Sequence, residues 1–403
     1  MEKFKVLIMG SDANSYYMAR CTYEKYHIKA HLIGQKRLAF TKYSNILTIS
    51  YVDDLWNYET FIKEVNNYAK LYKDYKILLV STNETYSGFI AKYKDLLEDN
   101  LYYFNQNINI LDTLTNKEKF YKTYKNSGLS FPKTIYYNVL KDNIIPEFTY
   151  PVVVKPSNVV KYNHISFNDK HKIYKLDSKE ELIEVLSQIK DGGYDDTLII
   201  QEFIPGDDTY LFDSVVYVSR KGEVKLISFA EIGLQERSKT MVGNAAVLIN
   251  NYNLYDGDID KMKKTIHKFM TDLKMNGFYE FDMKYDSRSK EFKVLEINAR
   301  QGRCSYYISA LGANLIEIMV NDLILKKDID YYNMEKVCLL SFVPKSIVKK
   351  YINNEKYVKK VLKLWRKRVS PMECKLDKNF LRFLMMKKRL WHYNIEYKNS
   401  YWK

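Results

Sequence analysis

The sequence predicts a mixed α/β and α+β architecture with three segments, which we place at residues 1–115, 116–330 and 331–403. Three observations lead to it. Apolar strands alternate with helical stretches over roughly the first 115 residues. Short strands bounded by Pro and Gly are frequent between residues 150 and 300. From about residue 331 the composition becomes basic and aromatic.

The first segment begins with a strand, a turn and a helix. Residues 4–9 form an apolar run that ends at Gly10, and residues 15–26 follow with helical spacing. A second apolar run, 76–80, ends in the polar turn Ser-Thr-Asn-Glu at 81–84. In open α/β sheets the ligand binds at the carboxyl ends of the strands. We therefore expect a small parallel layer with a ligand-facing edge.

The second segment changes from long helices to short strands. After a helical stretch at 116–126, prolines at 132, 151 and 156 interrupt the pattern. An acidic helix is expected at 178–190, where Ser178 and Glu181 form a capping box. The strands that we expect here are 152–155, 197–203, 211–218, 224–230 and 292–297. This pattern indicates a mixed domain with many antiparallel pairs.

The third segment carries almost all of the excess positive charge. Residues 331–403 contain 19 Lys and Arg against 5 Asp and Glu, a net +14 of the +15 of the whole chain. Val358, Val361, Leu362 and Trp365 fall on one helical face opposite a row of lysines. This segment is expected to be an interaction surface for anionic lipid headgroups or a phosphate-rich precursor, apart from the catalytic centre. The alternative is that its apolar face packs on the core while the lysines stay in water.

Several classes of protein are excluded as leading interpretations. No apolar run approaches the ~20 residues that span a bilayer, and the amino terminus leads into no signal-like stretch. The four cysteines lie far apart without Cys-x-x-Cys spacing, which indicates neither disulfides nor a zinc site. No P-loop or Gly-x-Gly-x-x-Gly motif is present. We expect a cytoplasmic protein, with peripheral contact at the membrane surface through 331–403.

A strand pair with oxygen ligands is the strongest local signal. The run that contains Asp282 is followed by a turn at 286–288 and by a strand with Glu296 and Asn298. Antiparallel pairing would place these three side chains together, with Glu296 and Asn298 on one face. Such hard ligands suit Mg²⁺. The alternative is a hairpin whose acids face water.

Two further signals precede this strand pair. Lys155 ends an apolar strand directly before Pro156, where it could bind a ligand or guard a sheet edge. A strand at 198–204 stops at a Pro-Gly pair and is followed by Asp207 and Asp208. The backbone groups at the end of this strand could bind adenine and the carboxylates could bind ribose, or the segment could be an ordinary turn.

Together and in this order, these motifs resemble the ATP-grasp superfamily over roughly residues 1–330. The resemblance implies an amino-terminal Rossmann-like (pre-ATP-grasp) domain, an ATP-grasp domain with a lid subdomain at about 150–205, and the basic helical extension. It implies that Lys117 and Lys155 hold ATP phosphates. The residues that it assigns to adenine and ribose are Gln201, Glu202, Ile204 and Asp208.

The same resemblance implies a site for Mg²⁺ (or Mn²⁺) and for the acyl phosphate. Its metal ligands fall on Asp282, Glu296 and Asn298. Arg300 follows them and is expected to steady the acyl phosphate. Arg303 is expected to assist, since a guanidinium fork matches paired oxygens; the alternative is that it is a surface charge.

A narrower resemblance is to the peptidoglycan D-aspartate ligases. Residues 10–20 and the Gln-Gly-Arg-Cys-Ser-Tyr-Tyr element at 301–307 are similar to that subgroup, as is the basic extension. The lid loop at 157–164 contains no glycine, unlike many superfamily members, so cradling of phosphate by its backbone is not expected. Cys304 within the element is expected to be a packing residue.

These resemblances imply an ATP-dependent carboxylate–amine ligase that works through an acyl phosphate. The expected substrates are D-aspartate, through its β-carboxyl, and the lysine amine of a muramyl-peptide precursor. A ligase for another amino acid or metabolite, of the dipeptide-forming type, is an alternative. A basic nucleic-acid-binding protein is a further alternative, but such a protein has no need for Lys155, Asp282, Glu296 and Asn298 in order. We expect no nucleic acid partner.

Overall fold

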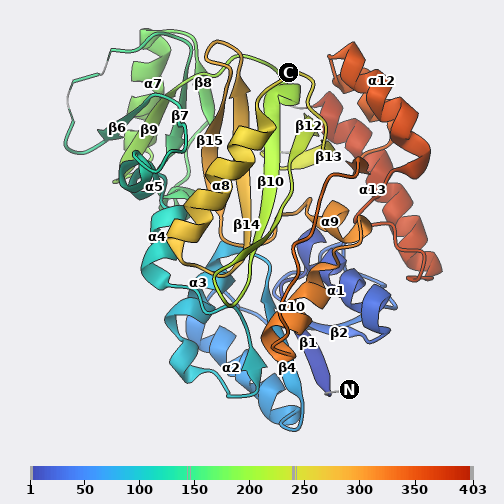
Figure 1. Ribbon diagram of the computed structural model, residues 1–403. Coiled ribbons are helices and arrows are strands. Elements are labelled where there is room, and N and C mark those ends of the chain that lie inside the picture. The colour runs from blue at the N-terminus through green and yellow to red at the C-terminus, as the bar shows by residue number, and fades with distance from the viewer. Residues whose placement is uncertain (1–2, 143, 146, 238–240, 242, 400–403) are drawn as a thin grey trace.

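The computed structural model of the protein contains three β-sheets with helices packed on their faces (Figure 1). It describes residues 3–142, 144–145, 147–237, 241 and 243–399. The last four residues of the basic extension, 400–403, lie outside the described residues. The predicted mixture of a parallel α/β layer and an α+β region is confirmed.

The amino-terminal sheet is parallel and has the order β3-β2-β1-β4-β5. Successive residues of β1 point to opposite faces, so Val6 and Ile8 pack toward α1 while Leu7 and Met9 pack toward α2 and α3. Its elements are β1 (Phe4–Met9), α1 (Ala13–Tyr26), β2 (Ala30–Gly34), β3 (Leu47–Tyr51), α2 (Tyr58–Leu71), β4 (Lys76–Ser81), α3 (Glu84–Lys92) and β5 (Leu101–Tyr102). Both strands predicted in this segment are present.

A four-stranded antiparallel sheet, in the order β6-β9-β7-β8, follows in the chain. Helix α7 covers one face, and its predicted capping box forms: Ser178 accepts a hydrogen bond from the Glu181 amide at 3.2 Å. The elements are α4 (Ile108–Thr115), α5 (Lys117–Tyr124), β6 (Thr134–Asn138), β7 (Val152–Pro156), α6 (Val159–His164), β8 (Tyr174–Leu176), α7 (Lys179–Asp191) and β9 (Thr197–Glu202).

The largest sheet is seven-stranded and antiparallel, in the order β15-β14-β10-β12-β13-β16 with β11 paired to β10. Helix α8 packs Ile266, Phe269 and Met270 against one face (Figure 1). The strand predicted at 224–230 is two strands, because pairing with β10 ends at Ile227 and β12 begins at Ala230. The elements are β10 (Leu211–Val218), β11 (Val224–Ile227), β12 (Ala230–Gln235), β13 (Ala245–Asn250), α8 (Ile259–Leu273), β14 (Gly277–Asp286), β15 (Glu291–Asn298) and β16 (Cys338–Ser341).

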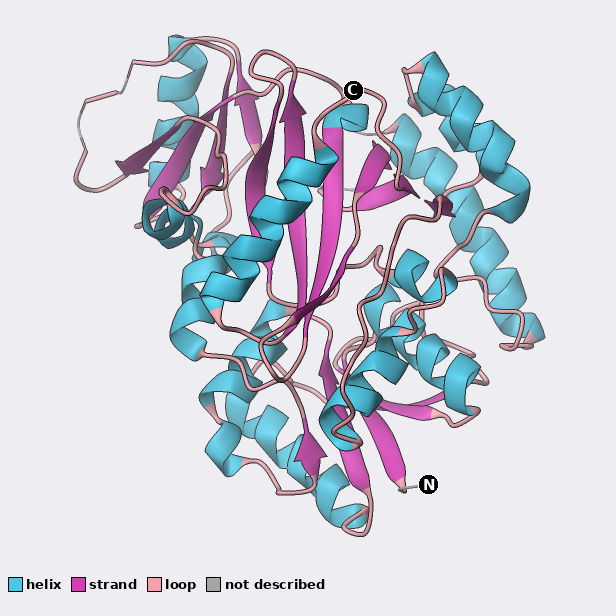
Figure 2. Cartoon of the chain, viewed as in Figure 1, coloured by secondary structure: helices cyan, strands magenta, loops and turns pink. Residues whose placement is uncertain are grey.

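The remaining helices complete the core and form the basic extension. They are α9 (Tyr306–Ala310), α10 (Leu315–Met319), α11 (Lys345–Tyr351), α12 (Glu355–Leu364) and α13 (Phe380–Lys398). Figure 2 shows α12 and α13 on the side of the large sheet opposite the four-stranded sheet. Among the described residues, no helix is long and apolar enough to cross a membrane.

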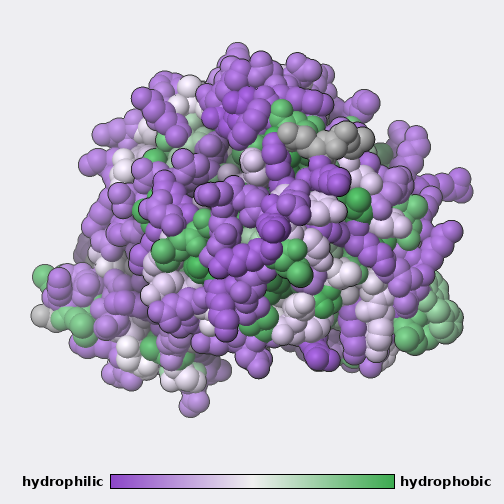
Figure 3. All heavy atoms as spheres, turned by 90° about the horizontal axis from the view of Figure 1, so that it is seen from below, coloured by the Kyte–Doolittle hydropathy of each residue, from purple (hydrophilic) through white to green (hydrophobic). Residues whose placement is uncertain are grey.

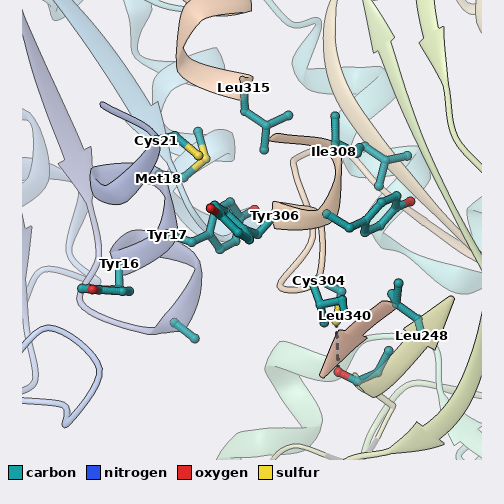
Figure 4. Packing of buried hydrophobic residues seen from close by; sticks show 14 of the residues in the cluster. Tyr16, Tyr17, Met18, Cys21, Leu248, Cys304, Tyr306, Ile308, Leu315 and Leu340 are labelled. Atoms are coloured by element: carbon teal, nitrogen blue, oxygen red, sulfur yellow. Dashed lines mark hydrogen bonds between the residues drawn. The ribbon is translucent and has the colours of Figure 1, made fainter. Parts of the chain in front are cut away.

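One hydrophobic core joins the amino-terminal layer to the large sheet. Tyr17, Met18 and Cys21 of α1 face Tyr306 and Leu315 (Figure 4). The same cluster continues through β13 and β16 to α13. The two sheets are thus held in a fixed relation, with the end of β4 opposite the residues that follow β15.

Candidate active site

Two neighbouring cavities between the sheets contain all of the predicted site residues. The first, of about 550 Å³, is lined by Lys117, Asp282, Glu296, Asn298, Arg300 and Arg303. The second, of about 390 Å³, is lined by Lys155, Gln201, Glu202, Ile204 and Asp208. We call them the reaction cavity and the nucleotide cavity. The volume of each is in the range of small-ligand sites.

The register of three antiparallel strands builds the acidic wall of the reaction cavity. Asp282 of β14 lies opposite Glu296 of β15, and Asp213 of β10 lies opposite Asp282 on the other side. Asn298 lies two residues beyond Glu296 and donates a hydrogen bond from Nδ2 to Asp282 at 3.1 Å. The predicted grouping of these side chains is therefore present. Glu280 adds a further carboxylate, because it pairs with Asn298 across the strands.

Burial and mutual repulsion control the ionisation of these carboxyl groups. Burial, together with neighbouring carboxylates, raises the pKa of Asp213 to about 7 and the pKa values of Glu280 and Asp282 well above their usual range. The Lys117 ammonium, 2.6 Å from Glu296, holds the pKa of Glu296 well below its usual range. A divalent cation would relieve the repulsion that adds to burial in raising the pKa values of Asp213, Glu280 and Asp282.

The donor set fits Mg²⁺ with phosphate oxygens as additional ligands. Asp282, Glu296 and Asn298 supply carboxylate and amide oxygens, which are hard ligands. Within the described part of the chain, no three His, Cys, Asp or Glu side chains are grouped to hold a metal ion by themselves. The two acids and one amide therefore suit an ion that retains water and substrate ligands, as Mg²⁺ does at phosphates.

Lys155 is a buried ammonium without a carboxylate partner among the described residues. Lys155 is the penultimate residue of β7, its side chain lines the nucleotide cavity, and its Nζ donates to the Tyr121 hydroxyl at 3.3 Å. Burial, reinforced by the nearby Lys117, lowers the pKa of Lys155 to about 7. A phosphate group beside Lys155 would restore its charge. This position fits phosphate binding better than the alternative, a solvated lysine that prevents strand pairing at a sheet edge, because β7 is paired on both sides.

Nucleotide binding should therefore be accompanied by proton uptake. At pH 8 a lysine with a pKa of about 7 is ~90% neutral. A bound phosphate would raise the pKa of Lys155, so that the lysine takes up a proton from the solvent. ATP binding should therefore be linked to the uptake of nearly one proton at pH 8 and of little at pH 6. Titration calorimetry with EDTA, in buffers of different ionisation enthalpy, measures this uptake. Lys155→Met should abolish it and weaken ATP binding by about 10-fold or more, since a hydrogen bond to a charged group is lost.

A lysine distant from the cavities supplies the control for that experiment. Lys268→Met on α8 removes an exposed ammonium that, among the described residues, forms an ion pair with Asp272 of the same helix and no other. It should leave both the affinity and the proton uptake at the wild-type values. Equal uptake by the wild type and Lys155→Met would contradict the assignment of Lys155.

The two predicted arginines line the reaction cavity but are held by different partners. Arg300 pairs with Glu84, from the amino-terminal layer, at 2.6 Å. Arg303 is buried, pairs with the fully buried Glu236 at 2.5 Å, and lies over the Phe342 ring. The alternative interpretation of Arg303 as a surface charge is therefore wrong. Among the described residues, the Nε and Nη2 atoms of Arg303 and the Nε atom of Arg300 have no assigned hydrogen-bond partner, and all three atoms are buried.

The nucleotide cavity lies between the four-stranded sheet and the large sheet. The buried Gln201 is fixed by a 2.7 Å hydrogen bond from its Nε2 to the Thr134 hydroxyl. Asp208 accepts hydrogen bonds from the amide and side chain of Gln235 and pairs with Arg237 at 3.0 Å. Its carboxylate is thus already oriented at the cavity wall. Glu202 is held by Arg288 at 3.0 Å.

The basic extension also contributes to the sites, so the expectation that it lies apart from the catalytic centre is wrong. Tyr351, Ile352 and Asn353 line the nucleotide cavity. The Tyr393 hydroxyl of α13 donates to Glu236 at 3.1 Å, the same carboxylate that holds Arg303. Helix α12 packs through Tyr357 and Val361 onto the core, which confirms the packing alternative for that helix.

The glycine-free lid loop forms a short helix. Asn158 caps α6 by accepting a hydrogen bond from the Lys161 amide at 3.1 Å. Ser157, Asn158 and Val159 line the reaction cavity. Cys304, by contrast, is a packing residue: burial raises the pKa of its thiol well above the ordinary value, and the thiol donates to the Ala245 carbonyl at 3.0 Å.

Sequence reasoning missed four acidic residues that line the reaction cavity: Glu84, Asp112, Asp213 and Glu280. Asp213 and Glu280 join it through strand pairing, and the pattern of each strand alone does not specify its partner. Glu84 carried a usable signal, because it ends the polar turn after β4 where a parallel sheet binds ligands. No sequence pattern indicated Tyr393.

Comparison with known proteins identifies the domain that supplies most of the lining of these cavities. Residues 114–302 match the family described as the ATP-grasp domain. The chain is 29% identical to a D-aspartate ligase of Enterococcus faecium (strain Aus0004), over 99% of this chain and 97% of that protein. That protein is similar to this chain from end to end, including the basic extension.

Solved structures have the same fold at lower sequence identity. One is an N5-carboxyaminoimidazole ribonucleotide synthetase in complex with ADP, with a TM-score of 0.65, 13% identity, and coverage of 98% of this chain and 99% of that chain. Another is an L-amino acid ligase from Bacillus licheniformis, with a TM-score of 0.58, 18% identity, and coverage of 80% and 74%. At these identities the likeness concerns the fold.

Proposed function

We propose that this chain, whose residues 114–302 match the ATP-grasp domain, is a ligase that uses ATP and Mg²⁺ to form a C–N bond, and that it joins the β-carboxyl group of D-aspartate to the lysine side-chain amine of a peptidoglycan precursor. The observation that carries the proposal is the end-to-end similarity to a D-aspartate ligase. A cytoplasmic muramyl peptide would be the amine acceptor.

The reaction requires a carboxylate to become an electrophile. A β-carboxylate oxygen attacks the γ-phosphorus of ATP, ADP leaves, and the acyl phosphate is then attacked by the amine, which releases phosphate and loses a proton. Phosphoryl transfer depends on positioning and on neutralisation of charge. In our proposal Lys117 and Lys155 hold the phosphates, and Mg²⁺ supplies further neutralisation between them.

The proposed roles of the reaction-cavity residues follow from their positions. Asp282, Glu296 and Asn298 would hold the metal on the acidic wall. The guanidinium groups of Arg300 and Arg303, which line the cavity, would bind the carboxylate and then the acyl phosphate. Glu84, paired with Arg300, would fix that guanidinium from the amino-terminal layer.

The test is the amino-acid dependence of ADP formation. ADP release by the purified protein with Mg²⁺ should require D-aspartate, and hydroxylamine should trap the acyl phosphate as the β-hydroxamate, identified by mass spectrometry. D-Asparagine is the matched control, because it keeps the α-carboxyl group but replaces the β-carboxyl with an amide. It should give no ADP above background.

The possible results distinguish a wrong substrate from a wrong type of reaction. ADP formation with L-aspartate or another amino acid, but not with D-aspartate, would contradict the substrate and leave an ATP-grasp ligase of another specificity. Turnover of D-asparagine would contradict the use of the β-carboxyl group. Once D-aspartate is established as the substrate, a muramyl peptide that contains lysine should yield an amide product. The analogue in which alanine replaces that lysine should yield none.

A further inference from the structure

Helix α13 presents two chemically different faces. One face docks on the body of the protein through Arg382, Tyr393 and Tyr397, which are all buried. Arg382 pairs with Asp377 at 2.9 Å and lies over the Tyr16 ring, while the Tyr397 hydroxyl donates to the Gln235 carbonyl at 2.6 Å. These three residues are spaced eleven and four apart, which is one side of a helix. The orientation of α13 is therefore fixed.

The opposite face of α13 is apolar and exposed. Phe380, Leu384, Trp391 and Ile395 are 71%, 48%, 62% and 37% exposed. Their spacings of four, seven and four place them in one row along the helix. Figure 3 shows hydrophobic side chains gathered at the right-hand edge of the molecule, where Figure 1 places the amino-terminal end of α13. We call this row the outward face of α13.

Lysines flank the same row. Lys387, Lys388 and Lys398 are exposed, and none of them makes an ion pair with another described residue. The arginines of the helix are instead neutralised by Asp377 and Glu396. The outward face thus combines large apolar side chains with unpaired positive charges, in a segment whose net charge is +14 over residues 331–403.

We propose that the outward face of α13 binds the surface of an anionic lipid bilayer, with the helix parallel to the membrane plane. Phe, Leu and Trp side chains enter the boundary between headgroups and acyl chains, while flanking lysines contact anionic headgroups. A soluble polyphosphate would neutralise the lysines but leave the apolar row in water. A symmetric second copy would cover the row but bring like charges together across the interface.

The proposal assigns this role to α13 and not to α12. The apolar residues of α12, such as Tyr357 and Val361, are buried in the core, so its exposed residues are charged: lysines and Glu355. Lysines alone give an electrostatic attraction that salt removes. The pair of helices therefore supplies a matched comparison within one protein.

Vesicle sedimentation of the full chain tests the proposal. Binding to vesicles of 30% phosphatidylglycerol in phosphatidylcholine should be at least about 10-fold tighter than to phosphatidylcholine alone, and should weaken as salt rises from 50 to 500 mM. Lys387→Gln/Lys388→Gln should weaken it by about 10-fold or more, since each lysine near an anionic surface contributes roughly fivefold. Leu384→Ser/Trp391→Ser should weaken it by at least as much.

The control changes the same charge elsewhere in the extension. Lys356→Gln/Lys363→Gln removes two exposed lysines from α12 and should alter vesicle binding by less than about twofold. All of these positions lie outside the two cavities, so ADP formation without vesicles should be unchanged. Tryptophan quenching by brominated lipids should be present in the wild type and reduced in Trp391→Phe.

Several results would overturn the proposal. Equal vesicle binding by Lys387→Gln/Lys388→Gln and by Lys356→Gln/Lys363→Gln would contradict a specific role of α13 in membrane binding. A dimer in sedimentation equilibrium that Leu384→Ser/Trp391→Ser abolishes would identify a second copy as the occupant. Tight binding of the free nucleotide-sugar precursor that is lost in Lys387→Gln/Lys388→Gln would identify a soluble phosphate ligand instead.

Discussion

Replacement of Glu296 with Gln should lower the rate of ATP turnover by about 100-fold or more. The Lys117 ammonium keeps the pKa of Glu296 well below its usual range, so the carboxylate is ionised at neutral pH and can bind a cation. The amide keeps the shape but loses the charge that faces the metal. Loss of one preorganised electrostatic contact in an active site typically costs 10²–10³ in rate. Steady-state ADP formation over a range of Mg²⁺ concentrations measures the effect.

A second glutamate on the same strand is the control. Glu291→Gln also removes a β15 carboxylate, but Glu291 is exposed and pairs with Lys293 at 2.7 Å outside both cavities. It should keep the wild-type rate and the wild-type Mg²⁺ dependence. If Glu296→Gln turned over ATP as fast as Glu291→Gln, the metal site would have to lie elsewhere. Partial recovery of Glu296→Gln at high Mg²⁺ would support a weakened ligand set.

Replacement of Arg303 with Met should reduce both stability and activity. The change leaves Glu236 fully buried without its ion-pair partner, which typically destabilises a protein by ~3–5 kcal/mol. It also removes a guanidinium group from the wall of the reaction cavity. Thermal unfolding and ADP formation with D-aspartate measure the two effects. We expect turnover at least about 100-fold below the wild type.

The double variant Arg303→Met/Glu236→Gln separates structure from catalysis. It removes both charges of the buried pair, and Gln can still accept the hydrogen bond from the Tyr393 hydroxyl. Stability should recover by a large part of the loss, because no unpaired buried charge remains. Turnover should stay as low as in Arg303→Met. Recovery of turnover together with stability would mean that Arg303 only supports the fold.

Local sequence patterns predicted the elements of this protein well where hydrophobic periodicity and caps were clear. The β1, β4 and β7 runs and the capped helix α7 required no knowledge of the fold. The grouping of Asp282 with Glu296 was also accessible, since a short hairpin fixes which residues face each other. The contacts that were predicted are therefore local in the chain.

Contacts between distant segments were not accessible from the sequence. Asp213 reaches Asp282 only because β10 pairs with β14, about seventy residues later, and no turn fixes that register. Glu236 meets Tyr393 of α13 across more than 150 residues. The positive charge of residues 331–403 predicted a role for the lysines of this segment. The contacts that connect α13 to the site are instead hydrogen bonds from the hydroxyls of Tyr393 and Tyr397. Composition indicates which residues are present, but not their neighbours.

The single core that runs from α1 to α13 has a consequence for how the molecule loses its structure. Residues from Val6 to Tyr397 share one hydrophobic cluster, so loosening either end of the chain exposes apolar surface at the other. The four-stranded sheet is packed mainly by a separate cluster, although Ile199 of β9 belongs to the cluster beneath α8. We therefore expect local unfolding of this sheet to expose the nucleotide cavity, which it lines, before the core shared by both ends of the chain is lost.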